Sequence, residues 1–462
     1  MPARTVAVVG GGVAGLSAAW ELLQHNDVRV VVLEAAGVTG GKLRSAEVAG
    51  HPVDVGAESM LARRPEGTGL VAELGLDARL THPEPVPAAV WSRGRREPLP
   101  PGTVMGVPTD PAAASGVLTA AEVARATAER VGPPLDTDVA VGDFVADRVG
   151  PAVVDRLVEP LLAGVYAGHA RQLSLQATVP ALWSAAAAGT PVVGGPPTPT
   201  PAGAGGPVFA GYAGGLGALA ADLAAVLADR GVELRTGRTV RELARRPDGW
   251  RLTVGPTIRP EALEVDGVVL AVPATPAARL LRPVASGAAE LLDAVDYASV
   301  AIVTLALPRR AAGQLDGSGF LVPPVEPLAI KAATFSSAKW AWLDDLDPEV
   351  VYVRTSLGRA GEVSVLQCDD ADLVRVAVAD LQTVLGHDLP APVEAHVQRW
   401  GGALPQYAVG HLARIQSVLD AVATLPALGL AGAAYEGVGI PACVASGRRA
   451  ARQVLADLRQ RQ

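Results

Sequence analysis

Three glycines near the N-terminus have the spacing of a loop that binds a dinucleotide. Gly10, Gly12 and Gly15 separate an apolar run over residues 6–9 from a helical pattern over residues 13–23. In such a G-x-G-x-x-G loop the first glycine permits a tight turn, the second lets backbone amides approach a pyrophosphate, and the third lets the helix pack against the strand. The start of a helix also attracts an anion, because its first amides are unpaired. We therefore predict a pyrophosphate site at residues 10–15.

A carboxylate stands at the expected distance from this loop. The next apolar run, residues 28–33, ends in Glu34, about twenty residues beyond the last glycine, where an acidic residue binds the ribose of a dinucleotide. Proteins that bind NAD and proteins that bind FAD share this sequence pattern, so these residues alone leave the choice of dinucleotide open.

A second glycine-lined helix start occurs near the C-terminus. Gly437 and Gly439 allow close backbone approach, and Pro441 stands in the first turn of a helical pattern, where its missing amide costs nothing. Two such helix starts suit one extended ligand, with its pyrophosphate at the first and a flavin ring at the second. This distant return favours FAD, because a simple NAD-binding domain has no need of it.

Composition excludes several other classes of protein. With 39 basic and 47 acidic residues the formal net charge is −8, which opposes nucleic-acid binding. The two cysteines, Cys368 and Cys443, have no metal-site spacing, so we expect no metal. No apolar run approaches the roughly eighteen residues that span a bilayer. We expect a cytoplasmic protein with at most peripheral membrane contact.

The order of apolar and helical patterns predicts an α/β fold: a Rossmann-like FAD-binding domain with an inserted mixed-sheet substrate domain and a helical subdomain. Strand-like runs over residues 265–272, 301–307 and 350–355 mark the resumed dinucleotide domain and the substrate domain. The FAD-binding domain is predicted at 1–70, 218–295 and 400–462, the substrate domain at 71–90, 186–217 and 296–399, and the helical subdomain at 91–185. Residues 172–221 carry no charge. This stretch could form a lid or membrane-facing element, or it could be a loop without function.

The segments "EAAGVTGGKLRS" and "GHPVDVGAESM" resemble the flavin amine oxidase superfamily. There a second glycine pair backs the flavin phosphates, here Gly40 and Gly41, followed by Lys42 in place of the commoner arginine. Farther along the chain, "GVYAGHARQLSL", "GFLVPP", "LGRAG", "LPQYAVGH" and "AGAAYEGVGIPACVASGR" together resemble the oxygen-dependent porphyrinogen oxidases, and the resemblance covers nearly the whole chain. It implies these cofactor-binding positions: Gly10, Gly11, Gly12, Val13, Ala14, Gly15, Glu34, Ala35, Gly41, Lys42, Gly56, Ala57, Glu58, Ser59, Val240, Trp400, Val438, Gly439 and Ile440.

The resemblance also implies a substrate. Where eukaryotic members carry Gly-Pro-Arg, this chain has Gly56, Ala57 and Glu58, a pattern similar to the Gram-positive branch that oxidises coproporphyrinogen III. The implied activity is that of an FAD oxidoreductase acting on CH–CH groups in heme biosynthesis. Hydride passes to flavin N5, dioxygen is the acceptor, hydrogen peroxide is a product, and a ferrochelatase is a possible transient partner. Protoporphyrinogen IX oxidase, a flavin amine oxidase and a non-catalytic flavin-binding scaffold of the porphyrin pathway remain alternatives. Against the amine oxidase, residues 299–307 offer no lysine near the flavin.

Substrate contacts are expected from basic and aromatic side chains. Propionates call for arginine or lysine, and two tyrosines in the quoted motifs could wall a pocket. The candidates are Arg64, Lys331, Lys339 and Arg354 for propionates, and Tyr166 and Tyr407 for the wall. No paired acid and base stands at telling spacing, so no catalytic residue is assigned, and we expect His411 to be structural.

Overall fold

The computed structural model describes residues 4–194, 206–310 and 315–460. Its centre is a five-stranded parallel sheet assembled from distant parts of the sequence, in the order β12-β2-β1-β16-β22. The strands are β12 (Glu233–Arg235), β2 (Val28–Leu33), β1 (Arg4–Val9), β16 (Gly267–Leu270) and β22 (Leu428–Leu430). The predicted return of the chain to the dinucleotide domain is therefore confirmed.

Both faces of this sheet are covered, as a parallel sheet requires. Val6 and Val8 of β1 pack into one core with α1 (Val13–Leu23), α2 (Pro65–Glu73), α9 (Leu216–Asp229) and α16 (Ile440–Gln460). Ala7 and Val9 point to the other core, which contains α10 (Ala274–Leu281), α11 (Ser286–Asp293) and α15 (His411–Ala423). A small antiparallel sheet covers the same side, made of β13 (Val240–Arg246), β14 (Gly249–Val254) and β15 (Glu261–Val265).

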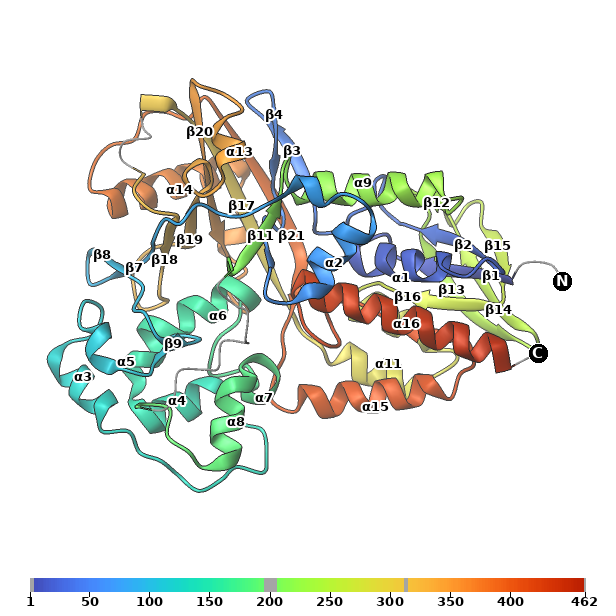
Figure 1. Cartoon of the computed structure of the whole chain (residues 1–462), viewed down its shortest axis with the longest axis horizontal. Coiled ribbons are helices and arrows are strands. Elements are labelled where there is room, and N and C mark those ends of the chain that lie inside the picture. Colours follow the sequence, from blue (N-terminus) through green and yellow to red (C-terminus); the bar gives the residue numbers. More distant parts are fainter. Residues whose placement is uncertain (1–3, 195–205, 311–314, 461–462) are drawn as a thin grey trace.

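The first and last helices of the chain lie side by side (Figure 1). An added Cβ at Gly447 of α16 would lie 2.1 Å from the carbonyl oxygen of Ala14 in α1. Only glycine permits this approach, which brings the two predicted glycine-lined helix starts into one region.

A second, seven-stranded sheet has the order β21-β17-β20-β19-β18-β7-β8. It is mixed, because β18 and β7 run parallel while the other neighbours are antiparallel. The strands are β21 (Glu394–Pro405), β17 (Tyr297–Pro308), β20 (Val350–Leu357), β19 (Ile330–Phe335), β18 (Gly319–Leu321), β7 (Ala88–Ser92) and β8 (Arg95–Pro98). One face packs against α14 (Asp370–Leu385), so alternate residues on the other face, Arg354 among them, are available to the flavin-binding region.

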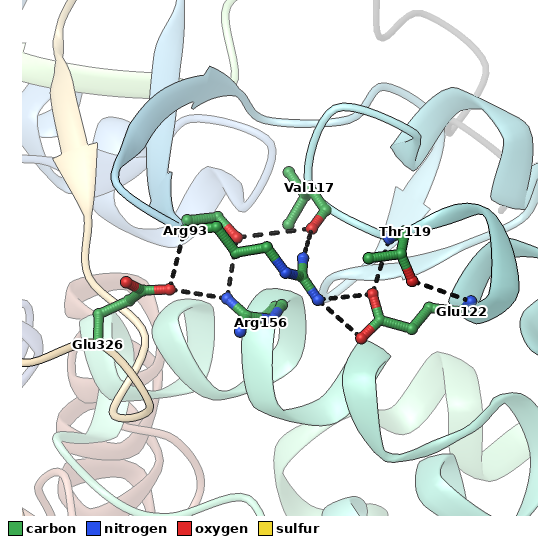
Figure 2. A network of polar contacts seen from close by, with 7 residues as sticks. Arg93, Val117, Thr119, Glu122, Arg156 and Glu326 are labelled. Atoms are coloured by element: carbon green, nitrogen blue, oxygen red, sulfur yellow. Dashed lines mark hydrogen bonds and ion pairs between the residues drawn. The ribbon is translucent and has the colours of Figure 1, made fainter.

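The helical subdomain lies below this sheet in Figure 1. It contains α3 (Ala120–Thr127), α4 (Val141–Val149), α5 (Pro151–Val153), a π-helical turn (Val154–Val158), α6 (Glu159–Tyr166), α7 (Leu175–Thr178) and α8 (Pro180–Ala188). Figure 2 shows how it is fastened to the sheet. Glu326 accepts hydrogen bonds from the Arg156 guanidinium at 2.7 Å and the Arg93 amide at 2.8 Å, while the Arg93 guanidinium binds both carboxylate oxygens of Glu122 at 2.7 Å.

The predicted mixed sheet and helical region are present, but the predicted domain boundaries stay a prediction. Strand β21 runs without interruption through residue 400, the predicted boundary between the substrate domain and the last segment of the FAD-binding domain. Part of the uncharged stretch, 195–205, lies outside the described residues. Among the residues that the structure describes, no helix is long and apolar enough to cross a membrane.

Candidate functional site

The loop between β1 and α1 has the geometry expected of the predicted phosphate cradle. Gly10 has φ +107°, and an added Cβ there would lie 2.3 Å from the Ala271 carbonyl oxygen. A Cβ at Gly15 would lie 1.9 Å from the Gly10 carbonyl oxygen. At Gly12, in contrast, the nearest atom is the Gly41 Cα at 3.9 Å. Gly10 and Gly15 are thus required by the fold, whereas Gly12 leaves space in front of the helix start.

The start of α1 has unpaired donors facing that space. Gly12 is the N-cap residue, and no side chain caps the helix. The first amides of an α-helix have no partner within the helix. A pyrophosphate fits both the open space and these donors, so the geometry suits the group that the sequence predicts.

Glu34 is held at the end of β2. Its carboxylate accepts a hydrogen bond from the Gly11 amide at 2.6 Å and another from the Ala36 amide at 2.7 Å. The carboxylate is therefore fixed against the phosphate loop, with acceptor capacity left for ribose hydroxyls. Val240, predicted to contact the adenine, begins β13 nearby, and its carbonyl oxygen accepts a hydrogen bond from Arg279 at 3.3 Å.

Lys42 has no anionic partner among the described residues. It follows the glycine pair Gly40 and Gly41, which joins the phosphate loop through a hydrogen bond from the Gly40 amide to the Gly11 carbonyl oxygen at 2.8 Å. The Lys42 ammonium forms no hydrogen bond or ion pair with any residue that the structure describes. Burial lowers the pKa of Lys42, although the nearby Cys443 acts in the opposite direction. An unpaired charge away from water is costly, so an anionic ligand such as a flavin phosphate would relieve it.

Glu58 unites three of the predicted site residues. Its carboxylate lies 2.6 Å from the Lys339 ammonium and 2.5 Å from the Arg354 guanidinium. Burial alone would raise the pKa of Glu58, but Lys339 and then Arg354 lower it to about 2. Arg354 also donates to the Gly56 carbonyl oxygen at 2.6 Å. The cluster therefore fixes the loop at residues 56–59 to the seven-stranded sheet, an arrangement that the sequence analysis did not foresee.

Trp400 packs against the same loop. Its indole N–H donates to the Val55 carbonyl oxygen at 2.9 Å, and an added Cβ at Gly56 would lie 3.2 Å from the ring. Residues 56–59 and Trp400, all predicted to contact the cofactor, are thus neighbours.

The C-terminal glycine turn comes directly before α16. Gly437 has φ +138°, a conformation open mainly to glycine. Val438 packs against the core that contains Tyr166 and Tyr407, whose ring centroids lie 5.6 Å apart. The buried ring of His411 stacks on Tyr407 at 3.8 Å, and burial lowers the pKa of His411 to about 4. The imidazole is therefore neutral near pH 7 and forms part of the packing.

The remaining propionate candidates occupy different surroundings. The Arg64 side chain is 47% exposed and pairs with Glu66 at 2.7 Å. Lys331 is buried and donates to the Gly358 carbonyl oxygen at 2.8 Å, and burial, followed by Arg359, lowers the pKa of Lys331 to about 7. Arg359, in the "LGRAG" segment, is a further buried cation that was not among the predicted site residues. Its position in that motif is the only sequence signal that could have singled it out.

A Rossmann-like sheet with a glycine-rich loop at its first helix, a carboxylate after the second strand and a distant return of the chain to that loop is typical of a flavin-dependent oxidoreductase. Comparison with known proteins agrees. The model of the family "Flavin containing amine oxidoreductase" matches residues 13–455, and the chain belongs to that family. Its cofactor is a flavin, so the prediction of FAD and of the fold class is confirmed.

Several relatives cover nearly the whole chain. The coproporphyrinogen III oxidase of Mycobacterium tuberculosis (strain ATCC 25618 / H37Rv) is 38% identical, with 99% of each chain covered. That of Bacillus subtilis (strain 168) is 30% identical over 98% of each chain. The protoporphyrinogen oxidase of Macaca fascicularis is also 30% identical over 98% of each chain.

Solved structures show the same architecture. A crystal structure titled "Putative protoporphyrinogen oxidase", from Exiguobacterium sp. 255-15, superposes with a TM-score of 0.86 at 30% identity over 100% of both chains. Cyclohexylamine oxidase from Brevibacterium oxydans reaches a TM-score of 0.71 at 17% identity, with 99% of this chain and 100% of that chain covered. The second likeness concerns the fold alone.

Proposed function

We propose that this protein is an FAD-dependent oxidase that converts coproporphyrinogen III to coproporphyrin III in heme biosynthesis, with dioxygen as acceptor and hydrogen peroxide as product. The observation that carries the proposal is the 38% identity to the mycobacterial coproporphyrinogen III oxidase over 99% of each chain. The departure from Gly-Pro-Arg at residues 56–58 points the same way.

The residues that hold the cofactor can each be given a task. The cradle at residues 10–15 and the Lys42 ammonium would receive the phosphates, and Glu34 the ribose. Residues 438–440 would lie against the flavin ring. Bound there, the flavin supplies a two-electron acceptor for hydride leaving a porphyrinogen carbon.

An ion-pair cluster joins the flavin-binding region to the seven-stranded sheet. The cluster of Glu58 with Lys339 and Arg354 ties the loop at residues 56–59 to the seven-stranded sheet, and we propose that this holds the predicted cofactor and substrate residues together. The contacts of Lys331, Lys339 and Arg354 with propionates and of Tyr166 and Tyr407 with the macrocycle stay proposals. Arg64 has the most exposed side chain of the four cations, and we propose it as the first to meet a carboxylate arriving from solvent.

The test is the initial rate of porphyrin fluorescence with the flavin-loaded protein in aerobic buffer, comparing coproporphyrinogen III with protoporphyrinogen IX after subtraction of autoxidation. We expect a marked preference for coproporphyrinogen III. Removing six electrons requires three dioxygen molecules, so three molecules of hydrogen peroxide should form for each porphyrin.

Gly12→Glu provides a matched control. Gly12 has an ordinary backbone conformation, with φ −73° and ψ 175°, and no atom within 3.4 Å of an added Cβ. The variant should therefore fold, but its carboxylate would occupy the phosphate space and repel the pyrophosphate. It should bind no flavin and accelerate neither reaction.

The alternatives give different outcomes of the same test. Faster turnover of protoporphyrinogen IX would assign the protein to the protoporphyrin step. Turnover of neither, with hydrogen peroxide formed from amines, would make it an amine oxidase. A bound flavin that porphyrinogen fails to reduce without oxygen would support a non-catalytic scaffold.

We further propose a cytoplasmic setting, with at most peripheral membrane contact, and transfer of the product to a ferrochelatase. Two free thiols, Cys368 and Cys443, suit a reducing compartment.

A further inference from the structure

The hydroxyl of Tyr407 joins the two ends of the C-terminal glycine turn. It donates a hydrogen bond to the Ala433 carbonyl oxygen at 2.5 Å and accepts one from the Gly437 amide at 2.9 Å. Tyr407 is 1% exposed, so water cannot replace either bond. The residues just after Gly437 are Val438 and Gly439, which are predicted to contact the flavin.

The ring of Tyr407 is held as firmly as its hydroxyl. Tyr166 packs against one side with centroids 5.6 Å apart, and His411 stacks at 3.8 Å with an interplanar angle of 14°. Because both neighbouring side chains are themselves buried, the hydroxyl has little freedom to move away from the turn.

The backbone of Tyr407 is bound to the helical subdomain. Its carbonyl oxygen accepts a hydrogen bond from the Ser174 amide at 2.7 Å. Asp138 accepts from the Ser174 hydroxyl at 2.6 Å and from the Gly410 amide at 2.9 Å. The backbone of Tyr407 is therefore anchored to the helical subdomain, while its hydroxyl binds the glycine turn.

We propose that Tyr407 is the positioning residue of residues 437–440, the part of the C-terminal glycine turn that leads into the predicted flavin contacts. A turn with Gly437 at φ +138° has no strand ladder to hold it, and the Gly437 amide has this hydroxyl as its hydrogen-bond acceptor. The same turn leads into the N-terminus of α16, which is the positive end of the helix dipole. Holding it in place keeps that positive end against the flavin, which favours electron uptake by the cofactor. The inference rests on the predicted contact of residues 438–440 with flavin and is independent of the choice of porphyrinogen.

The test is Tyr407→Phe, which removes only the hydroxyl. Two other buried tyrosines serve as matched controls. Tyr352→Phe also removes a buried hydrogen bond, from its hydroxyl to the Val48 carbonyl oxygen at 3.2 Å, on another element. Tyr435→Phe lies shortly before these residues and outside the predicted flavin contacts, and its hydroxyl has no hydrogen-bond partner among the described residues.

Flavin dissociation constants and the reduction potential of the bound flavin are measured for all three variants, without substrate. We expect Tyr407→Phe to weaken flavin binding about tenfold, the effect of one lost buried hydrogen bond, and to lower the potential. The amide of Gly437 should also exchange hydrogen faster. Both controls should keep flavin affinity within about twofold of the parent protein.

Equal flavin affinity and potential in Tyr407→Phe and Tyr352→Phe would overturn the proposal and leave Tyr407 a packing residue. If Tyr407→Phe does not fold, 3-fluorotyrosine at position 407 keeps the shape while making the hydroxyl a weaker acceptor. A changed flavin potential would support the proposal, and an unchanged potential would refute it. Since none of these readouts uses a porphyrinogen, failure of the proposed substrate would leave them unaffected.

Discussion

Glu58, in the loop after β4 (His51–Asp54), and Arg354, in β20, form an ion pair at 2.5 Å that crosses from the flavin-binding domain to the seven-stranded sheet. Lys339 completes the cluster from α12 (Ser336–Lys339) at 2.6 Å. The pair is mostly buried, with 14% of the Glu58 side chain and 9% of the Arg354 side chain exposed. Residues assigned separately to cofactor and substrate thus stabilise one another.

Glu58→Gln should destabilise the protein, because it leaves two mostly buried cations without their carboxylate. Breaking one partner of such a pair costs about 3 kcal/mol, which chemical denaturation would measure. As control, Glu66→Gln removes an exposed pair with Arg64, and such a pair contributes under about 1 kcal/mol. Equal losses in the two variants would contradict the role given to Glu58.

The same pair makes stability depend on acid. Because Lys339 and Arg354 hold the folded pKa of Glu58 at about 2 despite its burial, below its ordinary value of 4.5, the folded state binds fewer protons than the unfolded state between these values. The stabilisation is therefore complete above about pH 4.5 and is lost as the pH falls toward 2. Glu58→Gln should flatten this part of the stability profile.

Lys42→Met should have opposite effects on the flavin-free and flavin-bound proteins. Removing a partly buried charge that has no partner among the described residues relieves the apoprotein, so its unfolding midpoint should rise or stay level. Flavin affinity should fall at least tenfold, because a charge-assisted contact with phosphate contributes about 1.5 kcal/mol or more. Lys42→Arg, which restores the superfamily's commoner residue, should retain binding. Undiminished affinity in Lys42→Met would remove Lys42 from the phosphate site.

The dinucleotide half of the fold could be predicted from local patterns. The helix expected at 13–23 and the strand expected at 28–33 occur at those residues. The glycine spacing and the position of Glu34 are set by residues close together in the sequence, so local sequence patterns are enough to predict them. The C-terminal return was also predictable, since Gly437 and Gly439 mark a second close approach of backbone.

The charge clusters could not be predicted in the same way. Glu58 and Arg354 are separated by almost three hundred positions, and their pairing depends on how two sheets dock. The sequence around an isolated lysine or arginine does not show whether its side chain is buried, so charge alone groups Arg64, Lys331, Lys339 and Arg354. The structure places Arg64 at an exposed helix start and Lys331 among buried backbone, away from the Glu58 cluster.

Asp54 should make the stability of the protein depend on pH in the opposite direction to Glu58. Its carboxylate accepts hydrogen bonds from the amides of Leu216 at 2.7 Å and Gly217 at 2.9 Å, at the start of α9. Burial outweighs these bonds and raises the pKa of Asp54 to about 6. The folded state therefore binds more protons than the unfolded state between about pH 4 and 6, and stability falls as the pH rises through that window.

Asp54→Asn should remove this slope, at the cost of about 1 kcal/mol from the weakened helix cap. Urea denaturation at pH 4, 5, 6 and 7 would measure it. Asp388→Asn, at an exposed position, should leave the slope in place. An unchanged slope in Asp54→Asn would show that another group carries it.

Arg64→Ala should raise the KM for coproporphyrinogen III several-fold with little change in kcat, because a solvent-exposed cation contributes to capture of a carboxylate more than to the chemical step. Arg63→Ala is the matched control: the neighbouring side chain is exposed and forms no ion pair among the described residues. The difference between the two variants should shrink as salt is added, because exposed charges are screened. An equal KM in both variants at low salt would place the propionate contacts elsewhere, with the Lys339 and Arg354 cluster next to be tested.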